Sequence, residues 1–186
     1  MPGELVPTPM TFHEEWFSEA SQAVIVEAVE AVRPLRGQIV EIGCWEGRST
    51  IALAKAAYPE TVCAVDTWQG SKGEVSERIA ARRDVYTIFM DNVKELTAGN
   101  VAPFRMTWQE WFALNDEPIK FLHIDALHDY DDVKANIETA LQFIVPGGII
   151  CGDDVGFEPV RTAVLDVLEP YASVITKATE WLWECP

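Results

Sequence analysis

Short apolar runs alternate along the chain with longer stretches in which apolar residues return every three or four positions. Runs of Val, Ile and Phe are typical of buried strands, whereas the wider spacing is typical of amphipathic helices. The pattern predicts strands at residues 38–44, 61–68, 101–107, 120–127 and 149–155. It predicts helices at residues 48–57, 85–96, 108–114, 131–144 and 159–168.

The N-terminal part departs from this alternation. Residues 1–10 are rich in proline and predict an irregular arm. Residues 11–32 predict a long helix, because apolar residues return in it at helical spacing, and Pro34 and Gly37 then end it.

Two further segments need separate treatment. Residues 172–178 and 180–185 predict a closing hairpin. Residues 69–83 are polar and contain two glycines, which leaves a loop and a loosely held helix as open alternatives.

Strands that alternate with helices predict right-handed crossovers and a mainly parallel sheet that is covered on both faces. We therefore expect one doubly wound α/β fold, a Rossmann-like architecture with a mainly parallel seven-stranded sheet. Residues 1–37 would form an N-terminal arm and cap helix, and residues 38–186 the ligand-binding core.

Composition and charge exclude several classes of protein. The 186 residues suit one domain, and 48% hydrophobic with 24% charged residues is typical of a globular chain. A net charge of −16 argues against a nucleic-acid partner, because phosphate backbones are bound by clustered Lys and Arg. No apolar run approaches the roughly 20 residues of a membrane span.

The cysteines and the N-terminus bear on the compartment. The four cysteines show no CxxC and no disulfide-like spacing. The first ten residues lack the basic and apolar regions of a signal peptide. We therefore expect a cytoplasmic protein that makes no membrane contact.

In an open α/β sheet, ligands bind beyond the carboxyl ends of the strands. The turn after the first strand, ExGxxxG, holds Glu41, Gly43 and Gly47, and the helix behind it presents free N–H groups around Ser49. A dinucleotide enzyme would favour GxGxxG, and the Glu41 carboxylate is unfavourable beside a pyrophosphate. Beside an ammonium or a sulfonium it is favourable, and S-adenosylmethionine carries both. A tight structural turn is the alternative explanation of the glycines.

Asp66 stands at the end of the second strand. Acids at this position accept hydrogen bonds from ribose hydroxyls in nucleoside-binding folds. The turn and Asp66 together therefore indicate a nucleoside ligand.

Four segments, "VEIGCWEGRSTIALA", "AVDTWQG", "FLHIDALHDYDDVKANIETAL" and "PGGIICGDDV", resemble class I S-adenosylmethionine-dependent methyltransferases, in particular the branch of macrocin O-methyltransferase-like enzymes. The resemblance covers residues 38–165 and implies a sheet that ends in a reversed strand. It implies that the methionine end and the ribose of the cofactor contact Glu41, Gly43, Gly47, Ser49, Asp66 and Asp125. It implies that Thr67, Trp68, Thr107 and Trp108 lie near the adenine, although "RMTWQEW" lacks the acid that many relatives carry at that strand end.

Acidic residues also end the fourth and fifth predicted strands. If these strands are neighbours, Asp125, Asp153 and Asp154 lie close enough to share Mg²⁺ or another divalent cation. Metal-dependent members of the resembled branch carry acids at these positions. The alternative is that Asp154 caps a turn and Asp125 binds the methionine ammonium or water. Asp129, Asp131 and Asp132 are instead expected to cap the helix that they open.

His128 follows Asp125 by three residues. Its unperturbed pKa near neutrality suits a general base for a hydroxyl, and several relatives place a base histidine in this segment. A histidine bonded to the loop backbone is the alternative. His123, inside the fourth strand, is expected to be a satisfied core residue.

Other polar and aromatic residues leave two alternatives each. His13, Trp16 and Phe17 would form part of a lid over the acceptor or pack the first helix down. Arg78, Arg82 and Arg83 would bind an anionic acceptor or lie on a solvated helix face, and we expect the solvated face.

The sequence therefore predicts an S-adenosylmethionine-dependent O-methyltransferase, assisted by Mg²⁺ or another divalent cation, that acts on a hydroxyl of a small molecule such as a sugar or glycoside. Asp125 and His128 would be its catalytic residues. An NAD-type oxidoreductase and a non-catalytic nucleoside-binding module are the rival hypotheses. Because the short chain leaves little room for a separate substrate domain, a homo-oligomer in which a partner subunit completes the pocket is a further expectation.

Overall fold

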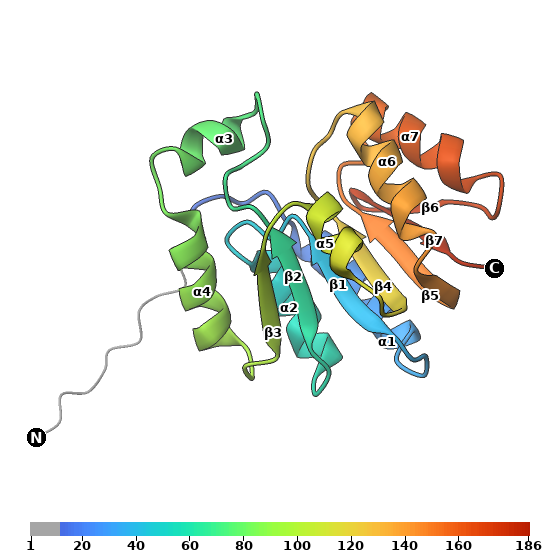
Figure 1. The fold of residues 1–186 in the computed structure, drawn as a ribbon, viewed down its shortest axis with the longest axis horizontal. Helices are drawn as coiled ribbons and strands as arrows, with labels where there is room; N and C mark the ends of the chain where they lie inside the picture. The colour runs from blue at the N-terminus through green and yellow to red at the C-terminus, as the bar shows by residue number, and fades with distance from the viewer. Residues whose placement is uncertain (1–11) are drawn as a thin grey trace, which may run out of the picture.

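The computed structural model describes residues 12–186, so the predicted arm at residues 1–10 lies outside the described part of the chain. A seven-stranded sheet with strand order β3-β2-β1-β4-β5-β7-β6 forms its centre (Figure 1). The first five strands pair in parallel, whereas β7 runs antiparallel to both β5 and β6. The predicted Rossmann-like fold with its reversed closing strand is therefore confirmed.

The elements follow one another in the predicted alternation. The strands are β1 (Gln38–Ile42), β2 (Val62–Asp66), β3 (Val101–Arg105), β4 (Ile119–Ile124), β5 (Ile144–Gly152), β6 (Ile175–Lys177) and β7 (Glu180–Glu184). The helices are α1 (Glu19–Ala31), α2 (Arg48–Ala57), α3 (Val75–Ala80), α4 (Val85–Leu96), α5 (Trp108–Leu114), α6 (Tyr130–Ala140) and α7 (Glu158–Leu168).

Helices cover both faces of the sheet. Helices α5, α6 and α7 bury apolar side chains against one face, on the near side in Figure 1. Helices α1, α2 and α4 cover the other face through two further clusters of buried side chains. The central strands are therefore covered on both sides, which explains why β4 is buried at every position, its polar residues Lys120 and His123 included.

The first helix is shorter than predicted. It begins at Glu19 and not at residue 11, because the Ser18 hydroxyl accepts a hydrogen bond from the Ser21 N–H and caps the helix. Residues 12–18 are non-helical and make contacts with the first strand-to-helix turn instead.

The boundary between α6 and β5 also differs from the prediction. The helix expected over residues 131–144 ends at Ala140, and β5 begins at Ile144 instead of residue 149. Strand pairing overrides the helical pattern here, since the Ile119 N–H donates to the Phe143 carbonyl at 2.9 Å.

Residues 69–83, for which the sequence left a loop and a loosely held helix as alternatives, contain the short helix α3. The proposed division of the chain at residues 37 and 38 stays a prediction.

Within residues 12–186, none of the helices has the combination of length and apolarity that crossing a membrane requires.

Candidate active site

The glycine turn after β1 lies directly against the end of β4. Gly43 has a φ of +88°, and a Cβ built on it would stand 1.7 Å from the Asp125 carbonyl oxygen. The Asp125 N–H donates to the Ile42 carbonyl at 2.8 Å. Gly43 therefore serves the close approach of two neighbouring strand ends, and it places the turn beside Asp125, one of the two predicted catalytic residues.

Gly47 begins α2 as its N-cap, with a φ of +90°. It has no side chain that could accept from the first N–H groups of α2, and the first turn contains no acidic residue. Ser49 is buried within this turn. The positive end of the ten-residue helix α2 is thus left without a side-chain cap, which suits a ligand carboxylate.

Asp66, at the end of β2, ties this turn to its neighbour strand. Its Oδ2 accepts from the Cys44 and Trp45 N–H groups at 2.8 and 2.9 Å, and its Oδ1 accepts from the Trp68 N–H at 2.6 Å. Burial raises the pKa of the carboxyl, although these three hydrogen bonds act to lower it. Two carboxylate oxygens offer about four acceptor positions, so Oδ1 keeps capacity for one further donor.

Glu41 is buried beneath the turn and is engaged by the chain's own side chains. The Thr50 hydroxyl donates to Glu41 Oε2, and Glu41 Oε1 lies 3.1 Å from His123 Nδ1. His123 Nε2 in turn lies 3.3 Å from Glu180 Oε2. Burial alone would lower the pKa of His123, but the ion pairs with Glu180 and Glu41 raise it well above its usual value. The satisfied core histidine is confirmed, and the predicted contact of Glu41 with a cofactor stays a prediction.

Asp125, His128 and Asp154 form a group whose ligand atoms all lie within 4.8 Å of one another. His128 Nε2 lies 2.8 Å from Asp154 Oδ2, and its Nδ1 lies 3.0 Å from Glu74 Oε1. Glu74 is distant in sequence from Asp125, His128 and Asp154, and it directly precedes α3, which lies beyond the carboxyl ends of the strands in Figure 1. The ring of His128 also stacks on Phe157, with centroids 5.6 Å apart.

The charges of this group shift one another's pKa. Burial raises the pKa of Asp125 to about 8, and the nearby Asp153 and Asp154 add to the effect. The ion pair with Asp154 raises the pKa of His128 to about 9, with Glu74 and Asp125 acting in the same direction. At neutral pH and without a cation, His128 therefore carries a proton that a general base would first have to lose.

Asp153 lies beside this group, and its charge acts on Asp125, but it is not one of the three residues whose ligand atoms meet. Its Oδ1 accepts a hydrogen bond from the Asp154 N–H at 2.7 Å. Asp154 itself has a φ of +64°, a left-handed conformation that is uncommon for a residue with a side chain. The three predicted acidic ligands thus end two neighbouring strands as expected, but the structure adds His128 to Asp125 and Asp154 in place of Asp153.

The residues predicted to lie near the adenine have contacts within the chain. Trp68 is buried against Tyr86 and Phe89, and its indole N–H donates to the Trp45 carbonyl at 2.9 Å. The remaining residues serve local structure: Thr67 accepts from the Gln69 N–H, Thr107 caps α5, and the Trp108 indole lies 3.3 Å from the Asp132 carboxylate. Their roles toward a cofactor stay predictions. The capping role of Asp129 at the start of α6 is confirmed.

A charged network across the first turn was missed at the level of sequence. His13 contacts the buried Glu46 carboxylate through its backbone N–H at 2.7 Å and through Nδ1 at 2.8 Å. Arg83 Nη1 lies 2.9 Å from both Glu14 Oε1 and Glu46 Oε1. The indole N–H of Trp45 donates to Glu14 Oε2 at 3.1 Å. The expectation that Arg83 lies on a solvated helix face is therefore wrong, since Arg83 joins residues 12–18 to the turn.

The aromatic residues Phe17 and Trp16 lie in different surroundings. Phe17 is buried, with its ring edge-on to His123, whereas Trp16 is exposed and its ring lies 5.4 Å from that of Trp45. Phe17 thus packs the chain onto the sheet, in agreement with the alternative in which these residues hold the N-terminal segment down. A lid over an acceptor stays a prediction.

Arg83→Ala is expected to lower the free energy of unfolding by about 1–2 kcal/mol, because it leaves the buried Glu46 carboxylate without its guanidinium partner. The matched control is Arg82→Ala, whose side chain is exposed and should cost less than about 0.5 kcal/mol. Urea denaturation of both variants measures the difference. Equal stabilities would show that the Arg83 network contributes nothing.

The amino-acid sequence is similar to that of known proteins. Residues 40–155 match the model of a family described as a methyltransferase domain. A protein of Sinorhizobium fredii named y4gI is 31% identical over 137 residues, which is 68% of this chain and 14% of the relative. This chain thus spans only about one seventh of that protein's length.

Solved structures share the fold at lower identity. The calicheamicin methyltransferase CalS11 is 16% identical, with a TM-score of 0.69 over 90% of this chain and 80% of its own. An O-methyltransferase from Bacillus cereus, solved in complex with SAH, is 20% identical, with a TM-score of 0.66 over 95% of this chain and 84% of its own.

Proposed function

Because the chain belongs to the family of methyltransferase domains that its residues 40–155 match, we propose that it is an S-adenosylmethionine-dependent O-methyltransferase acting on a hydroxyl of a small molecule. The observation that carries the proposal is the contact between Gly43 and the Asp125 backbone. This contact places an uncapped helix start and a group of acid and histidine side chains side by side at one edge of the sheet. The helix start suits a cofactor, and the group of acid and histidine side chains suits the hydroxyl of an acceptor.

The residues present fit S-adenosylmethionine. The first N–H groups of α2, around Ser49, suit the methionine carboxylate because no side chain caps them. Asp66 Oδ1 has remaining acceptor capacity for a ribose hydroxyl. The cofactor would supply a methyl group on a positively charged sulfur. Asp125, next to the turn, would help to hold the methionine ammonium.

Asp66→Ala is expected to weaken binding of S-adenosylhomocysteine by about 1.5–3 kcal/mol, because it removes a charge-assisted contact to the ribose. Calorimetry on the folded variant measures the change. Since Asp66 also holds the N–H groups of Cys44 and Trp45, Asp66→Asn is the matched control that keeps one acceptor oxygen and should lose less affinity. Unchanged affinity in a folded Asp66→Ala protein would remove Asp66 from the cofactor site.

The residues also fit a divalent cation. Carboxylate oxygens of Asp125 and Asp154 are ligands that Mg²⁺ prefers, and Asp153 lies next to them. Such an ion would supply positive charge that lowers the pKa of an acceptor hydroxyl. His128, whose nitrogen lies within the same group, would accept the hydroxyl proton.

Asp154→Asn is expected to weaken Mg²⁺ binding at least about tenfold, because it removes a charged ligand. In the wild type, affinity for Mg²⁺ should rise with pH up to about 9, since Asp125 and His128 must first lose protons whose pKa values are about 8 and about 9. Calorimetric titration at several pH values measures both effects, with Asp91→Asn on the exposed side of α4 as control. Full methyl transfer in the presence of EDTA would contradict the metal assistance.

A thermal-shift comparison of four ligands tests the function against its rivals. S-adenosylmethionine and S-adenosylhomocysteine should stabilise the protein, whereas NAD should not. Stabilisation by NAD alone would instead support an oxidoreductase. Equal stabilisation by adenosine, with no effect of Mg²⁺ on any ligand, would support a non-catalytic nucleoside-binding module.

The acceptor is proposed to be a sugar, a glycoside or another natural product with a free hydroxyl. The structural likeness to the calicheamicin methyltransferase CalS11 supports a small molecule. The net charge of −16 speaks against nucleic acid as the acceptor. A homo-oligomer that completes the acceptor pocket stays part of this proposal.

A further inference from the structure

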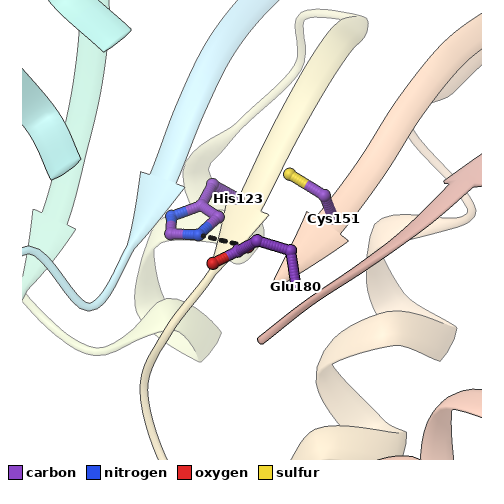
Figure 2. A group of neighbouring side chains, drawn as sticks. All are labelled: His123, Cys151 and Glu180. Carbon is purple, nitrogen blue, oxygen red and sulfur yellow. Dashed lines mark hydrogen bonds and ion pairs between the residues drawn. The ribbon is translucent and has the colours of Figure 1, made fainter. Parts of the chain in front are cut away.

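A row of buried polar side chains crosses the sheet beneath the proposed active site. Glu41 on β1 pairs in register with His123 on β4, and His123 pairs in register with Cys151 on β5. Residues in register on neighbouring strands point to the same face of a sheet. Glu180 begins β7 and reaches the same place, so three strands besides β1 contribute side chains (Figure 2). All four residues are completely buried.

Three of these residues offer the ligand atoms of a metal centre. One imidazole nitrogen of His123, the Cys151 sulfur and a Glu180 carboxylate oxygen all lie within 4.8 Å of one another. Figure 2 shows the three side chains converging from their separate strands. The distance from His123 Nε2 to Glu180 Oε2 is 3.3 Å. That is long for a charge-assisted hydrogen bond, for which about 2.7–2.9 Å is usual. It matches the distance of about 3.3 Å between two ligands that each lie about 2.0 Å from a tetrahedral zinc ion.

We propose that His123, Cys151 and Glu180 bind one Zn²⁺ ion in the interior of the sheet. A nitrogen, a sulfur and a carboxylate oxygen together are a donor set that suits zinc, whereas Mg²⁺ and Ca²⁺ prefer oxygen alone. Such a centre would be structural, because it joins the reversed strand β7 to β4 and β5 and lies in a part of the core that solvent does not reach.

Two further observations support a bound ion. Glu180 Oε1 is buried and has no hydrogen-bond partner among the described residues, so it is free to act as a second carboxylate ligand. His123 Nδ1 lies 3.1 Å from Glu41 Oε1. A histidine that binds zinc through one nitrogen commonly donates its other N–H to a carboxylate, and Glu41 is placed to accept it.

The exchange of protons for zinc balances in charge. Before binding, a protonated His123, a neutral Cys151 thiol and the carboxylates of Glu41 and Glu180 sum to a charge of −1. Zinc takes the place of the proton on His123 Nε2 and of the thiol proton, and two protons leave. With a neutral imidazole, a thiolate, two carboxylates and Zn²⁺, the sum is again −1, so the buried charge does not increase.

Cobalt(II) is a probe that reports this centre specifically. The full-length chain is unfolded in a chelator, refolded with Co²⁺ or Zn²⁺, and freed of excess metal, because the completely buried position requires the ion to enter during folding. We expect one retained ion per chain, a thiolate-to-cobalt absorption band, and a higher melting temperature with Zn²⁺. The acidic group around Asp154 contains no sulfur and cannot give that band.

Matched variants assign the ligands. Cys151→Ala should lose the thiolate band and bind cobalt at least about tenfold more weakly. Cys63→Ala, on β2, which β1 and β4 separate from β5, should keep both the band and the retained ion. If Cys151→Ala does not fold, the metal content of the wild type still decides the matter. Less than about one tenth of an ion per refolded wild-type chain, or a band that survives in Cys151→Ala, would overturn the proposal and leave His123 in an ordinary buried ion pair.

Discussion

Gly43→Ala is expected to lower the free energy of unfolding by about 5 kcal/mol. The new Cβ would stand 1.7 Å from the Asp125 carbonyl oxygen, so β1 and β4 would have to separate at the point where they pair. Overpacking typically costs about 1–3 kcal/mol, and a left-handed conformation costs a residue with a side chain about 1–2 kcal/mol. Because the atom in the way is backbone and cannot rotate aside, we expect the upper end of the sum. For a chain of this size the melting temperature should fall by roughly 10–20 °C.

Gly73→Ala is the matched control for this prediction. Gly73 has a φ of +83°, nearly that of Gly43, but a Cβ there would meet nothing within 4 Å. It should therefore cost only about 1–2 kcal/mol, and the difference between the two variants isolates the contact with β4. Thermal unfolding of both proteins measures it. Equal destabilisation would mean that the strand ends move apart easily and that the turn does not fix the position of Asp125.

His128→Ala is expected to lower kcat by about 10²–10⁴-fold while the affinity for S-adenosylhomocysteine changes less than about twofold. In the wild type, kcat should rise with pH as His128 loses its proton, because only the unprotonated imidazole can accept the hydroxyl proton. The variant should lack this part of the pH profile. Initial rates with a hydroxyl acceptor that the wild type methylates, measured from pH 6 to 10, supply both numbers.

Glu74→Gln provides the control for the base assignment. Glu74 lies 3.0 Å from His128 Nδ1 and helps to raise the pKa of His128. Its neutral replacement should therefore move the rise in kcat to lower pH without abolishing activity. A pH profile that is identical in wild type, His128→Ala and Glu74→Gln would exclude His128 as the base.

The fold could be predicted from sequence because its signals are local. The helices over residues 48–57, 85–96 and 108–114 have the predicted limits, since each repeats apolar residues at helical spacing between clear breakers. The predicted limits of a helix were wrong where a long-range contact determined them. Pairing of Ile119 with Phe143 ended α6 early, and the cap at Ser18 combined with contacts to the turn to shorten α1.

Some residues of the candidate site could likewise be predicted from the sequence, and others could not. Residues at strand ends, such as Asp66, Asp125 and Asp154, could be found because parallel strands bring their carboxyl ends to one edge of the sheet. Glu74, Arg83 and Glu46 could not, because their partners are distant in sequence and lie in segments without periodicity. Nor does any sequence pattern bring Cys151 and Glu180 together with His123, since their meeting depends on the position of β7 beside β5.

The central claim is that the edge of the sheet beside Gly43 binds S-adenosylmethionine, and titration of the wild-type chain with S-adenosylhomocysteine by calorimetry tests it most directly. The account predicts one binding site per chain for S-adenosylhomocysteine and no measurable binding of NAD under the same conditions. Saturable binding of NAD to a folded protein that gives no heat with S-adenosylhomocysteine would contradict it.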